Sequence, residues 1–478
     1  MQILVTGATG FVGRALILRL SRDGHRVRAL VRSRARAADL LGAEVELADA
    51  TGEGALARAV EGCDAVIHLA GESVAGKRWT AARKRVLEDS RIALTEQLVA
   101  AIAAATVRPK VLVSASAVGY YGDRGDEELD ESSRPSDDFL GSMCQRWEAA
   151  ALAAEGHGLR VCCVRIGLVL GRGGGVLAAM LPLFRAGLGG PLGSGKQWFP
   201  WIHLHDLVEL LTTAATDARY RGPVLGVAPE AVTNAEFSRA LARAVGRWAV
   251  LPAPAFALRI ALGEAAAAVL AGQRCRPARA LALGFPFQFP TLAAALKDLF
   301  DGTDGPSFEP AGAPPASPYL ARRGARGKLH QRTILAAPLA EVWRFFSRAE
   351  NLGLLTPGDA VMQTRGPRPL EAGQGRRIEH TLKVGPVPLR WVSEFEVWEE
   401  GRRFVDVQLR GPFATWWHEH RFEQRADGTT QIDDTVYYRV PFGPIGWLAE
   451  RLFVRRQLRA IFEYRAQAIR LRFGRAPA

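Results

Sequence analysis

Cysteine is scarce in this chain, and its spacing argues against two common roles. Only 5 of the 478 residues are cysteine, the number is odd, and none form a Cys-x-x-Cys pair. A disulfide framework needs an even number of cysteines in an oxidising compartment, and a structural zinc site usually needs closely spaced pairs of cysteine ligands. The sequence therefore predicts a reducing, cytoplasmic setting for a protein without a disulfide framework.

Long apolar runs and a secretion signal are also missing. A membrane-spanning helix needs about 20 consecutive apolar residues. The most apolar stretch, near residues 258–270, is interrupted by Arg259 and Glu264. No signal peptide precedes the first apolar strand, so we expect neither export nor a membrane span.

The chain has fewer acidic residues (49 Asp and Glu) than basic ones (62 Lys and Arg), which leaves a net charge of +13. Such a charge would ordinarily favour nucleic acid or an anionic membrane surface as a partner. Here the basic residues are scattered, and arginine greatly outnumbers lysine. We therefore expect a small-molecule substrate and no specific nucleic-acid partner, and the sequence leaves the oligomeric state open.

The chain does have a phosphate-binding pattern at its start. An apolar strand, Ile3–Val5, leads into Gly7, Gly10 and Gly13, and an apolar helix begins near Phe11. In this order of strand, turn and helix, glycines permit a tight turn and a close approach of the backbone to a pyrophosphate. The helix N-terminus presents free N–H groups to the anion. The pattern predicts a dinucleotide-binding site.

The end of the second strand indicates which dinucleotide is bound. An NAD-binding protein usually has Asp or Glu about 20 residues after the glycine turn, where it holds the ribose 2′-hydroxyl. This chain has Arg32 and Arg34 there. Guanidinium groups offer forked donors that suit a 2′-phosphate. The sequence therefore favours NADP(H), with NAD(H) as the less favoured cofactor.

Two different patterns, separated by a polar segment, organise the chain. Residues 1–300 alternate apolar strands with helices, which predicts an α/β fold with a doubly wound parallel sheet, followed by a mostly helical substrate lobe over about 173–300. Residues 301–327 are rich in Pro and Gly and predict an interdomain linker. Residues 328–474 show alternating strands and a final long helix from about 445 to 473, which predicts an α+β domain whose curved sheet wraps a helix.

Further motifs connect the first part to a known superfamily. They are Ile67–Gly71, Gly71–Ser73, Ser116–Asp123, Val164–Gly171 and Trp198–Asp206. On these motifs, residues 1 to about 300 resemble the extended short-chain dehydrogenase/reductases, and within them the YfcH-like (SulA-type) NAD(P)-dependent epimerases. The resemblance implies a Rossmann fold and an NADP(H)-dependent oxidoreductase or epimerase that acts on a small molecule.

The same resemblance implies a set of site residues. It places Asp49 near the adenine and aligns Ser116 with the serine that polarises the substrate oxygen. The implied cofactor-binding residues are Gly7, Gly10, Phe11, Val12, Gly13, Arg32, Asp49, Leu69, Ala70 and Gly71.

One departure from the superfamily concerns proton transfer. Its members use a Tyr-x-x-x-Lys pair, in which the lysine lowers the pKa of the tyrosine. The corresponding segment, 138–148, contains neither residue type. Depending on the alignment, Leu140 and Cys144 take the two places, or Met143 takes that of the lysine. The usual acid/base pair is absent in either case.

Three residues could substitute for the missing pair. Tyr120 and Tyr121 lie just beyond Ser116, where each could act on a substrate or pack at the strand end. Arg91 falls where the superfamily often has an asparagine; it would suit a carboxylate or phosphate substrate, or it is a solvated helix residue. The alternative function is a catalytically inactive NADP(H)-binding sensor or ligand carrier scaffold. A tyrosine near the nicotinamide would favour the enzyme, and an apolar wall would favour the sensor.

The second part resembles the START-like helix-grip (SRPBCC) superfamily. The supporting motifs are Ala337–Trp343, Ala349–Leu352, Trp417–Phe422 and Arg455–Arg465. The resemblance implies an apolar cavity between sheet and long helix, holding an apolar ligand, although a fully packed core is the alternative. The expected wall residues are Trp391, Phe395, Trp398, Phe404 and Phe413.

Two histidines in this part raise the question of a metal. His418 and His420 stand two residues apart on a predicted strand, so they share a face. No third ligand stands out nearby in the sequence, and a catalytic zinc needs three. We therefore expect no metal site.

Overall fold

The computed structural model describes residues 1–74, 76–249, 251–301, 305–358, 362–365, 370, 372–384 and 387–475. The chain divides into two compact units, which are described separately. The N-terminal unit comprises Met1–Arg34 and Val45–Asp301. The C-terminal unit comprises Gly302–Ala478 together with Ala35–Glu44, which holds most of helix α2 (Arg34–Leu41).

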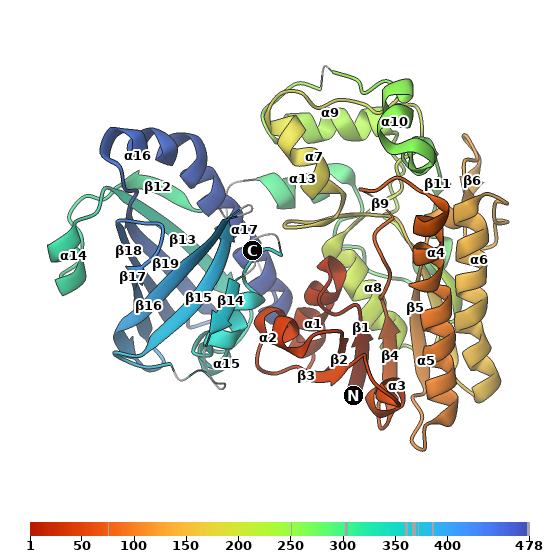
Figure 1. The fold of residues 1–478 in the computed structure, drawn as a ribbon, viewed down its shortest axis with the longest axis horizontal. Helices are drawn as coiled ribbons and strands as arrows, with labels where there is room; N and C mark the ends of the chain where they lie inside the picture. The colour runs from red at the N-terminus through yellow and green to blue at the C-terminus, as the bar shows by residue number, and fades with distance from the viewer. Residues whose placement is uncertain are drawn as a thin grey trace. The chain divides into compact units, whose positions relative to one another are not determined.

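A seven-stranded sheet in the order β10-β7-β5-β4-β1-β2-β3 forms the centre of the N-terminal unit (Figure 1). Every neighbouring pair in it is parallel. Parallel strands are buried on both faces, which is why they appear in the sequence as continuous apolar runs. The strands are β1 (Gln2–Thr6), β2 (Arg26–Val31), β3 (Glu46–Asp49), β4 (Ala65–His68), β5 (Val111–Ala117), β7 (Arg160–Ile166) and β10 (Gly222–Gly226). The predicted doubly wound α/β fold is confirmed.

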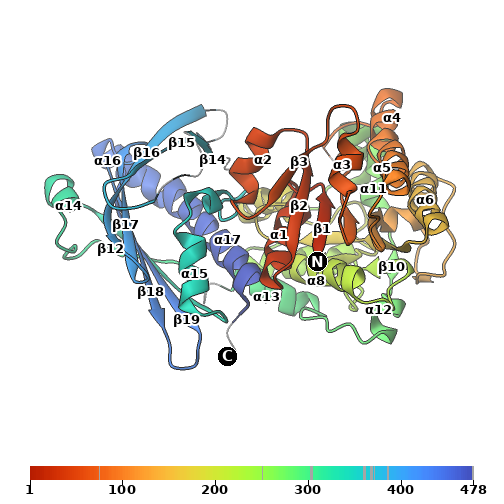
Figure 2. The ribbon, with the colours of Figure 1, turned by 90° about the horizontal axis from the view of Figure 1, so that it is seen from below.

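Helices cover both faces of this sheet. On one face, α3 (Ala55–Val60), α5 (Ile92–Ala104) and α6 (Phe139–Leu152) share a core with strand residues such as Leu4 and Leu112. Helices α1 (Phe11–Arg22) and α8 (Leu204–Thr216) pack together on the other face (Figure 2). The order of strands reverses between β1 and β4, and ligands of such sheets bind where the strand order reverses, outside the carboxyl ends of the strands.

Two predicted elements of this unit differ from the structure. The apolar pattern over Arg83–Ala105 predicts one helix, but the structure has two, α4 (Ala81–Asp89) and α5, with Arg91 as the N-cap of the second. The lobe expected over 173–300 is smaller, because β10 inside that range pairs with β7 in the main sheet. The remaining elements are β6 (Glu128–Leu129), β8 (Leu168–Leu170), β9 (Trp201–His203), β11 (Arg274–Cys275), α7 (Gly175–Arg185), α9 (Asn234–Ala244), α10 (Ala255–Leu262), α11 (Ala266–Leu270), α12 (Ala278–Ala282) and α13 (Leu292–Phe300), with short 3-10 turns at Val118–Tyr121, Ala153–His157 and Gly263–Ala265.

The C-terminal unit is built on an eight-stranded antiparallel sheet in the order β12-β13-β19-β18-β17-β16-β15-β14. Its strands are β12 (Ser307–Pro310), β13 (Gly327–Leu335), β14 (Met362–Arg365), β15 (Arg377–Val384), β16 (Val387–Glu399), β17 (Arg403–Arg410), β18 (Thr415–Gln424) and β19 (Thr430–Arg439). Helix α17 (Arg455–Phe473) runs along the curved sheet, with α15 (Leu339–Phe346) beside it (Figure 2). This arrangement is the predicted helix grip.

Here too the structure differs from the sequence-based expectation in two places. Part of the expected linker is ordered, because β12 pairs with β13 and helix α14 (Pro318–Arg323) buries Tyr319 and Leu320. The expected terminal helix is interrupted: α16 (Gly443–Ala449) leads through a π-helical turn, Glu450–Val454, into α17. Within the residues that the structure describes, no helix combines the length and apolar character needed to cross a membrane.

Candidate cofactor and substrate site

The glycine turn after β1 has the close contacts that only glycine permits. Gly7 has a φ of +69°, and a Cβ there would lie 2.8 Å from the backbone of Leu69. A Cβ at Gly13 would lie 2.3 Å from the carbonyl oxygen of Gly7, so helix α1 could not pack as closely on the turn. Gly10 is the N-cap of α1 and has no side chain to occupy the first N–H groups of the helix. The turn therefore fits an anionic pyrophosphate.

The segment after β4 lies beside this turn. The backbone N–H of Ala70 donates to the Thr6 hydroxyl over 3.2 Å, which brings the 69–71 segment to the end of β1. Phe11, at the start of α1, is partly buried and packs its ring against the glycines at 171 and 174. The structure thus brings together the expected cofactor residues Gly7, Gly10, Phe11, Val12, Gly13, Leu69, Ala70 and Gly71.

Arg32 stands at the end of β2 with its side chain 86% exposed. Its ion pair is a 3.8 Å contact from Nη1 to Oε1 of Glu72, and exposed pairs of this kind contribute little. Arg34 lies 3.4 Å from the carboxylate of Asp49, which is level with Val31 in the sheet. The guanidinium of Arg32 is therefore available to a phosphate, with Asp49 on the neighbouring strand.

A neutral histidine, which the sequence analysis did not single out, joins β1, β4 and α5. His68 is fully buried, with Nδ1 2.7 Å from the Thr6 hydroxyl and Nε2 3.0 Å from the Thr95 hydroxyl. Burial lowers the pKa of His68 to about 4. The imidazole therefore stays uncharged near neutral pH and has a structural role at the strand ends.

Ser116 lies at the end of β5, where a buried charge network surrounds it. Its hydroxyl donates to Oε1 of Glu148 over 2.6 Å. Arg165 holds the same carboxylate with two bonds, Nε to Oε1 at 2.8 Å and Nη2 to Oε2 at 2.9 Å. Burial opposes the charge of Arg165, but hydrogen bonds and attraction from Glu148 raise the pKa of the guanidinium. A substrate oxygen would have to displace the bond from Ser116 to Glu148.

The two tyrosines beyond Ser116 have different environments. Tyr121 is fully buried; its hydroxyl donates to the carbonyl of Asp130 over 2.8 Å and accepts from Arg165 over 2.8 Å. These contacts favour the packing alternative for Tyr121 over proton transfer. Tyr120 is half-buried, with the Arg165 guanidinium 3.5 Å from its ring centre. Burial outweighs the attraction of Arg165 and raises the pKa of Tyr120, so its phenol stays protonated near neutral pH.

Arg91 is not the solvated helix residue that was one alternative. Its Nη2 donates to the carbonyl of Glu72 over 2.9 Å, and its Nη1 donates to that of Leu87 over 3.2 Å. A Cβ on Gly71 would lie 3.2 Å from its guanidinium carbon, so the charge faces the segment after β4. Burial lowers the pKa of Arg91, although it stays far above neutrality.

Helix α6 presents apolar side chains where the superfamily has its Tyr and Lys. Met143 is buried in an apolar cluster with Trp79 and Leu87, and Leu140 packs against that cluster and Gly119. Burial raises the pKa of the Cys144 thiol to about 12, so it is not a thiolate nucleophile. The segment therefore presents buried apolar side chains at these places.

The C-terminal unit contains a cavity of about 320 Å³ between the sheet and α17. Four of the five expected wall residues line it: Trp391, Phe395, Phe404 and Phe413. The fully packed core is thereby excluded. The fifth, Trp398, is not among the described residues that line the cavity. Its ring stacks on that of Phe404, with the ring centroids 5.4 Å apart.

The two histidines of β18 lie in the same cavity with a carboxylate that the sequence analysis missed. His418 and His420 share a face, with ring centroids 3.9 Å apart. Asp406 of β17 lies opposite His418, and Asp434 of β19 lies opposite His420. Only strand pairing brings these residues together, because Asp406 is twelve positions from His418 in the sequence.

Three family models match the chain. The NAD dependent epimerase/dehydratase family matches residues 3–225, a domain of unknown function (DUF1731) matches 253–299, and the polyketide cyclase/dehydrase and lipid transport family matches 326–474. The first and last agree with the superfamilies that the motifs of the two parts resemble.

Relatives and a solved structure match the first part over nearly their full length. The chloroplastic epimerase family protein SDR39U1 homolog of Arabidopsis thaliana is 43% identical over 303 residues, covering 62% of this chain and 86% of that protein. A crystal structure of human SDR39U1 (isoform 2) with NADPH is 39% identical, with a TM-score of 0.58, covering 63% of this chain and 99% of that chain. Epimerase family protein SDR39U1 of Bos taurus is 42% identical over 304 residues, covering 63% of this chain and 99% of that protein. At this identity and coverage, the chain belongs to the SDR39U1 epimerase family.

Proposed function

We propose that the N-terminal unit binds NADP(H) and uses it in an oxidoreductase or epimerase reaction on a small molecule. The observation that carries the cofactor is the glycine turn, whose contacts leave no room for a Cβ at Gly7 or Gly13. Arg32 supports NADP(H) over NAD(H), because it offers an exposed guanidinium at the end of β2. The human relative was crystallised with NADPH, which agrees with this choice.

Three side chains would act on the substrate in this proposal. The bound cofactor supplies or accepts a hydride. Arg91, half-buried and facing Gly71, would orient a carboxylate or phosphate of the substrate. Ser116 would turn its hydroxyl from Glu148 to a substrate oxygen, where a donor stabilises developing negative charge. Tyr120, beside Arg165, is the remaining candidate for proton transfer.

A second candidate is a sensor or carrier scaffold that binds NADP(H) without turnover. The apolar side chains of Leu140 and Met143 and the thiol of Cys144 support it, because they occupy the places of the missing Tyr and Lys on α6. The bond from Ser116 to Glu148 supports it as well, since the polarising hydroxyl already has a partner.

The variant Ser116→Ala separates the two candidates. For an enzyme, we expect kcat to fall by about 10²-fold, the usual loss when one donor to a developing oxyanion is removed. The affinity for NADPH should be nearly unchanged, because the glycine turn and Arg32 are untouched. The measurement is NADPH-dependent turnover of a small-molecule substrate found by screening.

The control is Ser114→Ala, two positions earlier on β5. Its buried hydroxyl donates to the neighbouring carbonyl of Ala115 and to no other group among the described residues, so this variant should keep the parental rate. If Ser116→Ala also turns over at the parental rate, the serine is a packing residue. An absence of turnover in the parent protein would favour the sensor.

For the C-terminal unit we propose binding of an apolar small molecule in the cavity. The aromatic walls and the volume of about 320 Å³ support this, because pockets of this size enclose small ligands. Ile461 of α17 lines the cavity, so Ile461→Trp should fill part of it and weaken binding of an apolar fluorescent probe by about tenfold. Arg459→Trp, on the exposed side of α17, is the control. Equal affinities in the two variants would contradict the proposal.

A further inference from the structure

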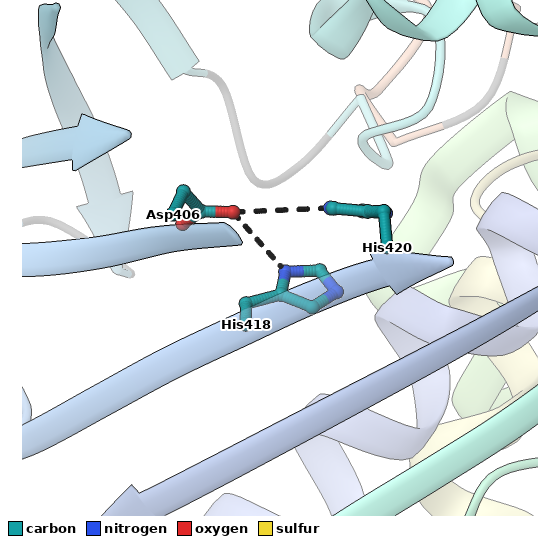
Figure 3. A group of neighbouring side chains, drawn as sticks. All are labelled: Asp406, His418 and His420. Atoms are coloured by element: carbon teal, nitrogen blue, oxygen red, sulfur yellow. Dashed lines mark ion pairs between the residues drawn. The ribbon is translucent and has the colours of Figure 1, made fainter. Parts of the chain in front are cut away.

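Three side chains converge on one point at the polar end of the C-terminal cavity. Asp406, His418 and His420 all line the cavity and come from the neighbouring strands β17 and β18 (Figure 3). Oδ1 of Asp406 lies 3.6 Å from Nδ1 of His418 and 3.8 Å from Nε2 of His420. Both histidines are nearly fully buried, with 4% of His418 and 5% of His420 exposed.

The other nitrogen of each imidazole faces a second carboxylate, Asp434. Oδ1 of Asp434 lies 3.3 Å from Nε2 of His418. The same oxygen lies 2.6 Å from Nδ1 of His420, but the geometry of this contact is not that of a hydrogen bond. Arg465 lies beside the same carboxylate, with Nη1 3.6 Å from Oδ1 of Asp434. A carboxylate oxygen accepts hydrogen bonds, so Asp434 can take the N–H of each imidazole and leave the other ring nitrogen of each facing Asp406.

This assignment leaves three acceptors facing each other. A neutral imidazole has one N–H and one lone pair. The lone pairs of His418 Nδ1 and His420 Nε2 therefore point to the same oxygen of Asp406. Two imidazole lone pairs and a carboxylate oxygen that face one another in this way are the donor atoms that a transition-metal ion takes.

We propose that Asp406, His418 and His420 bind a divalent transition-metal ion in the C-terminal cavity. Two ligand atoms at about 2.1 Å from one ion lie roughly 3–4 Å apart, which agrees with the separations of 3.6 and 3.8 Å. Imidazole nitrogens with one carboxylate favour zinc, iron or cobalt over calcium and magnesium, which prefer oxygen ligands.

The surroundings of the three ligands suit this role. Asp434 would orient both imidazoles from behind, as carboxylates commonly do around metal-bound histidines. Two carboxylates and one guanidinium leave one surplus negative charge, which a divalent ion offsets. Three protein ligands leave a coordination position open to the cavity. The proposal does not depend on the apolar ligand proposed above, because metal binding is measured directly.

The experiment uses the full chain, without a polyhistidine tag, after treatment with a chelator. Titration with Co²⁺ should give one bound ion per chain with visible d–d absorption, and Zn²⁺ should displace it. Mg²⁺ should not compete. No binding at stoichiometric concentration would overturn the proposal. Thiolate-to-cobalt charge-transfer bands would also overturn it, since all five cysteines lie outside the cluster.

Variants test the carboxylate ligand and the supporting carboxylate. Asp406→Asn keeps the shape of the side chain but removes a ligand charge, and we expect Zn²⁺ to bind at least 100-fold more weakly. Asp434→Asn should weaken binding by about 10- to 100-fold, the usual range for a residue that positions a ligand. His380→Gln is the matched control.

The control histidine lies in the same cavity but outside the cluster. His380 is buried and has Nδ1 3.1 Å from the Thr364 hydroxyl. His380→Gln should therefore bind Zn²⁺ like the parent. Thermal unfolding without metal checks that each variant is folded. If a variant does not fold, the cobalt spectrum of the parent protein still shows whether the metal binds. Parental affinity in folded Asp406→Asn would overturn the proposal.

Discussion

Glu148→Ala should lower the free energy of unfolding of the N-terminal unit by about 3–5 kcal/mol, the usual cost of removing one partner from a buried ion pair. Glu148 is 7% exposed and Arg165 is 3% exposed, and the two are joined by a pair of parallel hydrogen bonds. Without the carboxylate, the guanidinium stays buried with only neutral acceptors, Tyr121 and the carbonyl of Glu131. Urea unfolding of the full chain, followed by tryptophan fluorescence, measures the change.

Two controls separate the buried pair from a general effect of losing a charge. Glu127→Ala breaks an exposed ion pair with Arg124 and should cost far less, because solvent screens that pair. The double variant Glu148→Met/Arg165→Met should recover much of the lost stability, since no charge is then left unpaired. A single Glu148→Ala variant as stable as the parent would show that Arg165 finds other compensation.

Arg32→Asp should weaken NADPH binding by about 100- to 1000-fold. The substitution removes a charge-assisted hydrogen bond to the 2′-phosphate and places a negative charge beside it, together worth a few kcal/mol. NADH lacks this phosphate, so its affinity should change little. Titrations of both nucleotides, followed by nicotinamide fluorescence, give the two dissociation constants.

A matched control lies on the same strand. Arg26 is exposed at the opposite end of β2, so Arg26→Asp makes the same change in net charge away from the glycine turn. It should leave NADPH affinity close to that of the parent. Equal affinity of the parent for NADPH and NADH would contradict the assignment of Arg32 to the 2′-phosphate.

Local patterns in the sequence determined much of the fold. The glycine spacing at 7, 10 and 13 and the apolar run before it predict a strand, a turn and a helix within a few residues, and the structure has them as β1 and α1. Continuous apolar strands predict a buried parallel sheet, and alternating ones predict the antiparallel sheet of the C-terminal unit. These signals act over short distances, so they can be recognised without knowledge of the partners of each strand.

Pairings between distant residues were decided only by the tertiary structure. The sequence identified Ser116 as a candidate, but its partner Glu148 is 32 residues away and is held by Arg165 from a different strand. Part of the expected linker forms strand β12, which is held by backbone hydrogen bonds to β13. Backbone hydrogen bonds do not require apolar side chains, so a segment with few of them can still form a strand. Composition alone therefore predicts a linker there.

The same distinction explains the two histidines of the C-terminal unit. Their spacing by itself places both imidazoles on one face of a strand, which the sequence determined. The ligands that accompany them come from β17 and β19, and the register of three strands decides that Asp406 faces one side of the imidazoles and Asp434 the other. Register depends on the hydrophobic pattern of the whole sheet and on its turns, so it is a property of the tertiary structure and not of any one segment.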